Sequence, residues 1–219
     1  TREYVDIIRK ILARKEPVTS DGEFYPLPYS GTGSWGMGKS LKSIVHPLRS
    51  DVPIFIGAEG PKNVTQTARI ADGWLPLYYS PYRPEVYSDQ LTDARPGFEI
   101  SATVLANVDD DLSRALYPVK AMLGFYIGGM GSKDKNFHRD LMARMGYPNE
   151  AEEIQELFFA GKKDQAIEVV PDKFADEISL CGPVDRIKEK LSDWKKSPVT
   201  SLLINGDVKL LRQMAELAL

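Results

Sequence analysis

A glycine-rich segment between two apolar stretches contains the residues best suited to hold a phosphate group. It runs from Gly57 to Asn63. Gly57 and Gly60 let the backbone bend closely, and Pro61 presets the first turn of a helix. A helix that starts there directs free backbone N–H groups and the Lys62 ammonium into one small space, as a phosphate requires. In the alternative interpretation the turn only starts a helix, and Lys62 is solvated.

The flanking residues have the pattern of a strand, a turn, a helix and a second strand. The apolar run Ile54-Phe55-Ile56 is typical of a strand that is buried on both faces. After the turn, small and apolar residues recur at helical spacing, namely Val64, Thr67, Ala68 and Ala71. The next strand is predicted to begin at Trp74. These elements place the turn directly after a buried strand.

The sequences PIFIGAEGPKN (53–63) and ADGWLPLYYSP (71–81) together resemble the fingerprint of the luciferase-like flavin and deazaflavin oxidoreductases, in particular their coenzyme F420-dependent branch. The resemblance implies a (β/α)8 TIM barrel that binds F420 at its mouth and moves a hydride between the deazaflavin and a small organic substrate. It implies a cofactor phosphate site formed by Gly57, Ala58, Glu59, Gly60, Pro61, Lys62 and Asn63. It also implies substrate-pocket walls formed by Trp74, Tyr78 and Tyr79. FMN, in a monooxygenase of the same fold, is the alternative cofactor.

A second glycine-rich segment, residues 33–40, matches the G-x-x-x-x-G-K-S pattern of a nucleotide-binding phosphate loop. That site needs a buried strand before the loop and a sound helix after it. Here a proline-rich stretch precedes the loop, and Pro47 cuts short the only helical pattern after it. The sequence therefore favours a mobile loop. In the resembled family a similar loop borders the pocket, which implies a lid with Trp35 and Lys39 facing the ligand; a solvated loop is the alternative.

Composition excludes several classes of function. With 28 basic and 31 acidic residues and a net charge of −3, the chain gives no support for binding nucleic acid or anionic lipid. No apolar run is long enough to span a bilayer, and the single Cys181 cannot form a disulfide framework, so a reducing cytoplasm fits best. Because His46 and His138 are far apart in the sequence, no metal site is predicted. The aspartates at 109–111 are predicted to cap a helix.

The number of predicted strands indicates that only part of a barrel is present. Four barrel strands are predicted, at 53–57, 74–79, 98–106 and 200–204, whereas a (β/α)8 barrel needs eight strands and about 250 residues. We therefore expect one domain over residues 1–219, the C-terminal part of a barrel with a long helical insertion at about 109–180. A glycine-rich stretch in this insertion, 126–131, is expected to form a loop near the pocket.

The incomplete barrel leads to two expectations. The catalytic acid and base are not identifiable, since the resemblance implies that they lie on the first strands of the family's barrel. The strand at 53–57 is expected to pair with residues outside this sequence, in an absent N-terminal half or in a second copy, which makes a homo-oligomer the expected state. A non-catalytic half-barrel that serves as an assembly partner is the second hypothesis. A core-facing helix is expected over residues 1–14.

Overall fold

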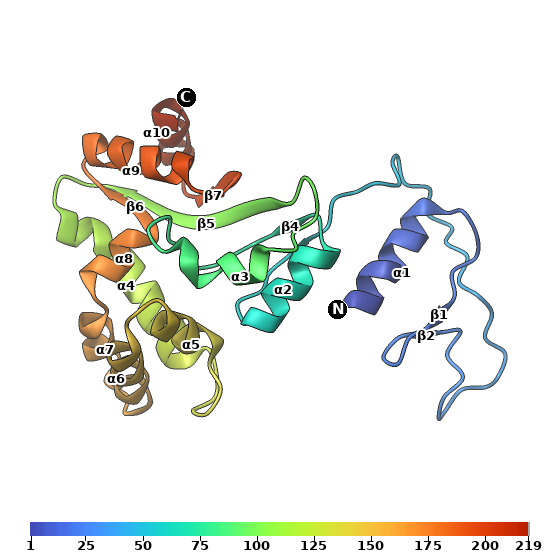
Figure 1. Ribbon diagram of the computed structural model, residues 1–219. Helices are drawn as coiled ribbons and strands as arrows, with labels where there is room; N and C mark the ends of the chain where they lie inside the picture. The colour runs from blue at the N-terminus through green and yellow to red at the C-terminus, as the bar shows by residue number, and fades with distance from the viewer. Residues whose placement is uncertain (219) are drawn as a thin grey trace.

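The computed structural model describes residues 1–218. Its centre is a parallel five-stranded sheet in which the long β5 pairs with three other strands (Figure 1). Leu105 of β5 pairs with β6 on one edge and with β7 on the other. The strands β3, β4, β5 and β7 therefore lie side by side in this order, and β6 pairs with the last residues of β5. The strands are β3 (Phe55–Ile56), β4 (Gly73–Trp74), β5 (Glu99–Val108), β6 (Ser179–Gly182) and β7 (Ser201–Asn205).

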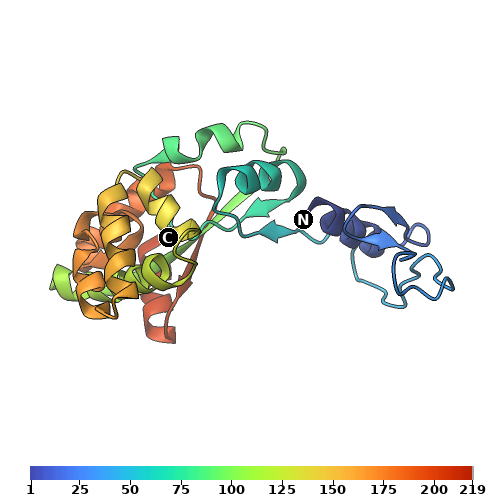
Figure 2. The ribbon, with the colours of Figure 1, turned by 90° about the horizontal axis from the view of Figure 1, so that it is seen from below.

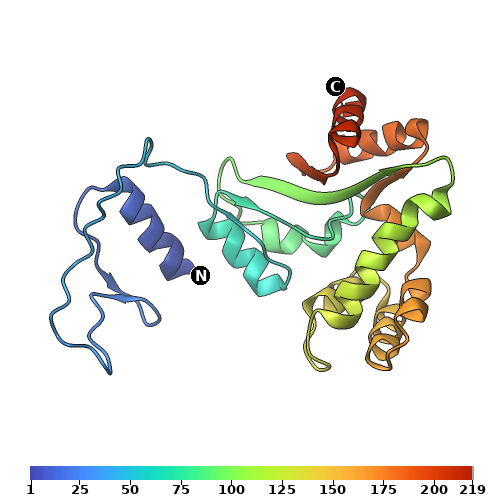
Figure 3. The same ribbon diagram turned by 180° about the vertical axis from the view of Figure 1, so that it is seen from behind.

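Helices connect these strands and form a separate bundle. The connecting helices are α2 (Pro61–Ile70), the 3-10 helix η1 (Pro84–Val86), α3 (Ser88–Leu91), α9 (Val184–Lys196) and the final α10 (Val208–Ala218). The bundle lies between β5 and β6 in sequence and beside the sheet in space (Figures 1 and 3). It comprises α4 (Leu112–Gly129), α5 (Phe137–Arg144), α6 (Pro148–Phe159), α7 (Lys163–Val169) and α8 (Asp172–Glu177). The residues predicted as a helical insertion are thus helical, and their assignment as an insertion stays a prediction.

The N-terminal residues form an arm that extends away from the sheet (Figure 2). It contains α1 (Arg2–Ala13), the short antiparallel pair β1 (Ser20–Asp21) and β2 (Pro26–Leu27), and then irregular chain. The predicted first helix is confirmed, but its apolar stripe is only partly buried, because α1 belongs to the arm and does not pack against the main core. Val5 and Ile7 are buried, whereas Tyr4 is 54% exposed. An ion pair of 2.9 Å between Arg9 and Asp72 joins α1 to the start of β4.

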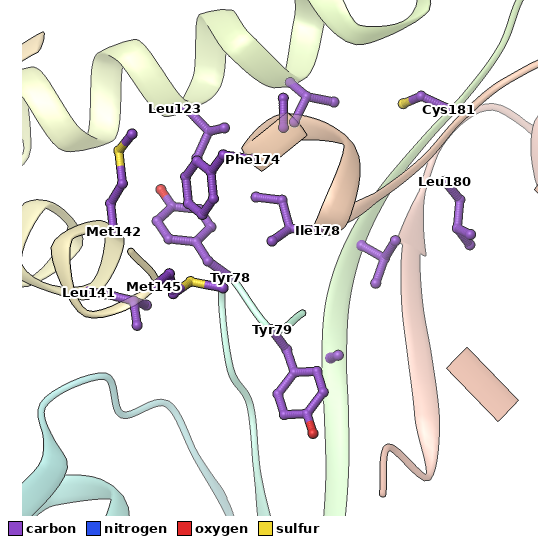
Figure 4. Close-up of a cluster of buried hydrophobic side chains, with 14 of the residues drawn as sticks. Tyr78, Tyr79, Leu123, Leu141, Met142, Met145, Phe174, Ile178, Leu180 and Cys181 are labelled. Atoms are coloured by element: carbon purple, nitrogen blue, oxygen red, sulfur yellow. The ribbon is translucent and has the colours of Figure 1, made fainter. Parts of the chain in front are cut away.

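The main core lies where the bundle meets the chain that follows β4 (Figure 4). Tyr78 packs there among side chains of three helices, including Leu123 of α4, Met142 of α5 and Phe174 of α8. These four side chains are fully buried. The bundle is thus joined to the sheet by shared apolar packing, which fixes α5 relative to the end of β3.

Of the glycines at 126–131, only Gly131 lies in a loop, the one between α4 and α5, whereas Gly128 and Gly129, like Gly124 before them, lie within α4. Their role is close packing between helices. A Cβ on Gly128 would lie 2.6 Å from the Cβ of Phe158 on α6, and one on Gly124 would lie 3.0 Å from Ile167 on α7. Only a residue without a side chain lets these helices approach so closely.

Two predicted strands are shorter than expected, and one strand was not predicted. The predicted strand at 74–79 forms ladder pairs only at Gly73 and Trp74, because Pro76 has no N–H to donate, although its carbonyl accepts from Thr103 N at 3.3 Å. The strand at 53–57 is likewise limited to β3. Cys181 and Gly182 belong to β6, the strand that was not predicted. The predicted cap is confirmed: the Asp111 carboxylate accepts from the backbone N–H groups of Ser113 and Arg114.

Candidate functional site

A cavity of about 370 Å³ lies between the end of β3 and the start of α5. Three stretches of chain line it: the turn before α2, the extended segment after β4 and the first turn of α5. The lining residues are Gly57, Ala58, Glu59, Gly60, Asn63, Leu75, Leu77, Phe137 and His138. One wall is therefore glycine-rich backbone and the other is mainly apolar.

The turn between β3 and α2 leads directly into a helix and presents backbone N–H groups that are unpaired within the described chain. Pro61 occupies the first position of α2, and the N–H groups of Asn63 and Val64 both donate to the carbonyl of Gly60, at 2.9 and 3.0 Å. The N–H groups of Ala58, Glu59 and Gly60 donate no hydrogen bond to any residue in 1–218. Free N–H groups at a helix start attract anionic oxygen, so this turn fits a phosphate group.

The predicted phosphate residues divide into two groups. Five of the seven line the cavity, and the exceptions are Pro61 and Lys62. Lys62 is exposed on the first turn of α2. Its ammonium can therefore contribute a nearby positive charge, but the cavity wall itself is made of backbone.

The three aromatic residues predicted as pocket walls are buried behind the cavity. Trp74, Tyr78 and Tyr79 are at most 2% exposed, and burial raises the pKa of Tyr79 to about 12. Side chains of an extended segment alternate between its faces, and here Leu75 and Leu77 are the ones that face the cavity. The Trp74 indole still acts on the site, since its Nε1–H donates to the Ala58 carbonyl at 2.8 Å and holds the turn from behind.

The cavity also contains a carboxylate and imidazole pair that the sequence did not indicate. His138 Nδ1 lies 2.9 Å from Glu59 Oε2. Both atoms are buried, and neither makes a hydrogen bond within residues 1–218, so the two groups are in close contact without hydrogen-bond geometry. The rings of Tyr126 and Tyr78 pack edge-on against the imidazole, with centroid distances of 5.0 and 5.6 Å. The hydroxyl of Tyr78 is buried too, and burial, together with the charge of Glu59, raises its pKa.

The other end of α5 contacts the same turn. Arg144, in the last turn of α5, donates from Nη2 to the Glu59 carbonyl at 2.9 Å. Together with the Trp74 bond to Ala58, this contact holds two consecutive carbonyls of the turn. Neither Arg144 nor His138 stood out in the sequence, because about 80 residues separate them from the turn and no local pattern shows the contact.

The predicted lid is not brought to this cavity. Residues 33–40 form a loop without a strand before it or a helix after it, as predicted for a segment that only matches the nucleotide pattern. Trp35 is 87% exposed, and neither it nor Lys39 lines the cavity. Both belong to the irregular chain of the N-terminal arm, after β2. The lid assignment therefore stays a prediction.

Residues 1–218 contain neither a metal-ligand cluster nor a membrane-spanning helix. No three or more histidine, cysteine, aspartate and glutamate side chains of this range are placed to hold a metal ion. Within the same range, every helix is too short or too polar to cross a membrane.

Residues 1–201 match the sequence profile of the family described as luciferase-like monooxygenase. The chain is 44% identical over 227 residues to a Mycobacterium tuberculosis protein named "Putative coenzyme F420-dependent oxidoreductase", an alignment that covers 99% of this chain and 65% of that protein. It is 26% identical over 167 residues to the 5,10-methylenetetrahydromethanopterin reductase of Methanopyrus kandleri, covering 73% of this chain and 46% of the reductase. The chain thus spans about half to two thirds of the length of these relatives.

Solved structures agree on the fold. The coenzyme F420-dependent tetrahydromethanopterin reductase from Methanopyrus kandleri superposes with a TM-score of 0.67 at 24% identity, over 94% of this chain and 56% of the reductase. An F420-dependent secondary alcohol dehydrogenase superposes with a TM-score of 0.63 at 16% identity, over the whole of this chain and 59% of the dehydrogenase. With its parallel α/β sheet and the family match over residues 1–201, this chain belongs to the luciferase-like monooxygenase family.

Proposed function

We propose that the natural protein carrying this chain is a coenzyme F420-dependent oxidoreductase, and that the cavity after β3 holds the phosphate-bearing end of the deazaflavin. The observation that carries this proposal is the turn at 57–60, whose free N–H groups border a cavity of about 370 Å³. The 44% identity to a protein named for this cofactor supports the choice of F420. The consecutive parallel strands β3, β4, β5 and β7 would form the C-terminal part of a TIM barrel.

The residues of this chain bind and orient the cofactor in this proposal. When bound, the deazaflavin supplies the hydride chemistry for a small organic substrate. The N–H groups at 58–60 would donate to the phosphate oxygens, while Trp74 and Arg144 hold the turn in shape through its carbonyls. The side chains of Leu75, Leu77 and Phe137 form an apolar wall that keeps water from the bound group.

Titration of the natural protein with F420 tests this function, with deazaflavin fluorescence as the signal. Saturable binding of F420 that is tighter than binding of FMN is expected. Tighter binding of FMN would instead support a monooxygenase that uses a flavin. If neither cofactor binds, the non-catalytic assembly partner becomes the better hypothesis.

Replacing Lys62 with alanine should weaken F420 binding by about 1 kcal/mol. An exposed lysine beside a bound anion contributes at the lower end of the range for charge-assisted contacts. Fluorescence titration of the variant against the wild type measures the change. Lys188→Ala, which removes an exposed lysine of α9, is the matched control and should bind like the wild type. Equal affinities for Lys62→Ala and Lys188→Ala would remove Lys62 from the site.

We also propose that the outer edge of β3 is paired in solution. Among residues 1–218, β3 pairs only with β4, so its other edge presents unpaired backbone groups beside apolar side chains. The 219-residue chain alone is therefore expected to sediment as an oligomer or aggregate, with a mass that rises with concentration. A monomer that melts cooperatively would show that this edge needs no partner.

A further inference from the structure

A carboxylate is an unusual neighbour for a phosphate, and Glu59 lines the cavity in which the phosphate is proposed to bind. The side chain of Glu59 is 17% exposed, and that of His138 is 14% exposed. Like charges repel more strongly at such partly buried positions than in bulk water. Each negative charge that enters the cavity is therefore repelled by Glu59, which weakens the binding of the group that carries it.

Glu59 cannot easily turn away from the cavity. Its carbonyl is held by Arg144, the carbonyl of the preceding Ala58 is held by Trp74, and its Oε2 lies against His138 Nδ1. The imidazole is in turn enclosed by the rings of Tyr78 and Tyr126. Backbone and side chain are both anchored, so the charge of Glu59 stays at the wall.

The pair with His138 limits this repulsion. His138 Nδ1 lies 2.9 Å from Glu59 Oε2, so the polar imidazole ring faces the carboxylate and offsets part of its charge. The N–H groups at 58–60 then suffice to bind a single negative charge. A second negative charge on the phosphate would be repelled by Glu59. No buried cation in the cavity wall would compensate for it, since the lining residues include no lysine or arginine.

We infer that the pair of Glu59 and His138 makes this subsite selective for a singly charged phosphodiester over a doubly charged phosphomonoester. The inference rests on the proposed function, and it names the charge state of the ligand that the site takes. F420 carries its phosphate as a diester, whereas FMN carries a monoester that is close to doubly ionised at pH 7. Glu59 is thus a specificity-determining residue that selects through the phosphate and not through the ring.

The test is a set of four affinities measured on the natural protein and its variants. The ligands are F420, FMN and their two phosphate-free counterparts, riboflavin and the deazaflavin chromophore with its ribityl chain. Glu59→Gln keeps an oxygen beside His138 and removes the charge. It should raise the affinity for FMN relative to F420 by about tenfold or more and leave the two phosphate-free ligands unchanged. Glu153→Gln, at an exposed position on α6, is the matched control.

A second variant keeps the inference testable if Glu59→Gln is poorly folded. His138→Gln removes the balancing imidazole and should change the ratio in the opposite direction, weakening FMN more than F420. Equal effects of Glu59→Gln on F420 and FMN, or an equally large change in the affinity ratio of the two phosphate-free ligands, would overturn the inference while the proposed function stands. If the wild type binds neither F420 nor FMN, the proposed function itself fails.

Discussion

Replacing Arg83 with alanine is expected to lower the free energy of unfolding by about 3–5 kcal/mol. The guanidinium donates from Nε and Nη2 to the two carboxylate oxygens of Glu177, at 2.6 and 3.1 Å, and from Nη2 to the Tyr147 hydroxyl at 3.1 Å. The side chain of Glu177 is only 9% exposed. The substitution therefore leaves a buried carboxylate without its partner, which costs far more than a lost surface contact. Urea unfolding of the variant and the wild type measures the difference.

An exposed ion pair provides the matched control. Arg69 and Asp93 lie 2.6 Å apart, but their side chains are 59% and 60% exposed. Arg69→Ala should therefore cost no more than about 1 kcal/mol. Arg83→Lys keeps the charge but loses the two-oxygen geometry, and it should fall between the two alanine variants. If Arg83→Ala and Arg69→Ala cost the same, Arg83 does not join the chain after β4 to α8 in the way the contacts indicate.

The Asn136→Ala variant should lose about 2–3 kcal/mol of stability and also displace α5. The Asn136 side chain is fully buried and acts in two directions. Its Oδ1 accepts from the backbone N–H groups of His138 and Arg139, at 3.0 and 3.1 Å, and its Nδ2 donates to the Ile127 carbonyl at 2.7 Å. Alanine removes a helix cap and leaves a buried carbonyl with one partner fewer. Thermal and urea unfolding measure the loss.

Two further variants serve as controls for the Asn136→Ala measurement. Asn149 lies in the first turn of α6, is exposed and makes no side-chain hydrogen bond within residues 1–218, so Asn149→Ala should unfold like the wild type. Asn136→Ser keeps a capping oxygen but is too short to replace the amide contact with Ile127, and it should recover about half of the loss. A fully stable Asn136→Ala protein would mean that α5 is held by its apolar packing alone.

Features set by neighbouring residues could be predicted, and features set by distant contacts could not. The strand, turn and helix around Gly57 to Lys62 follow from local patterns, and so does the cap at Asp111. The strand β6 was missed because Ser179–Gly182 is a short run that becomes a strand only by pairing with residues 105–108. For the same reason the contacts of His138 and Arg144 with the turn could not be predicted, since they depend on how the bundle packs on the sheet.

The assignment of pocket walls shows a different limit. The resemblance implied that the pocket walls are formed by the aromatic residues Trp74, Tyr78 and Tyr79. These side chains are large enough to fill the core between the sheet and the bundle. The residues that reach the cavity are the plainer Leu75 and Leu77, which alternate with Trp74 and Tyr78 along the same segment. When a segment is buried on both sides, the elements packed on it decide which of its faces contacts a ligand. The sequence of the segment alone does not show which elements these are.

The pairing of β5 also has a consequence for how the chain folds during synthesis. Ser101 of β5 pairs with Ser201 of β7, so one of its edges cannot be completed until nearly the whole chain has left the ribosome. The bundle α4 to α8 lies between these partners in sequence, and its helices contact one another within this one stretch of chain. Local helical contacts form faster than distant strand pairs. The bundle is therefore expected to fold first, while the edge of β5 that pairs with β7 stays unpaired until β7 has been synthesised.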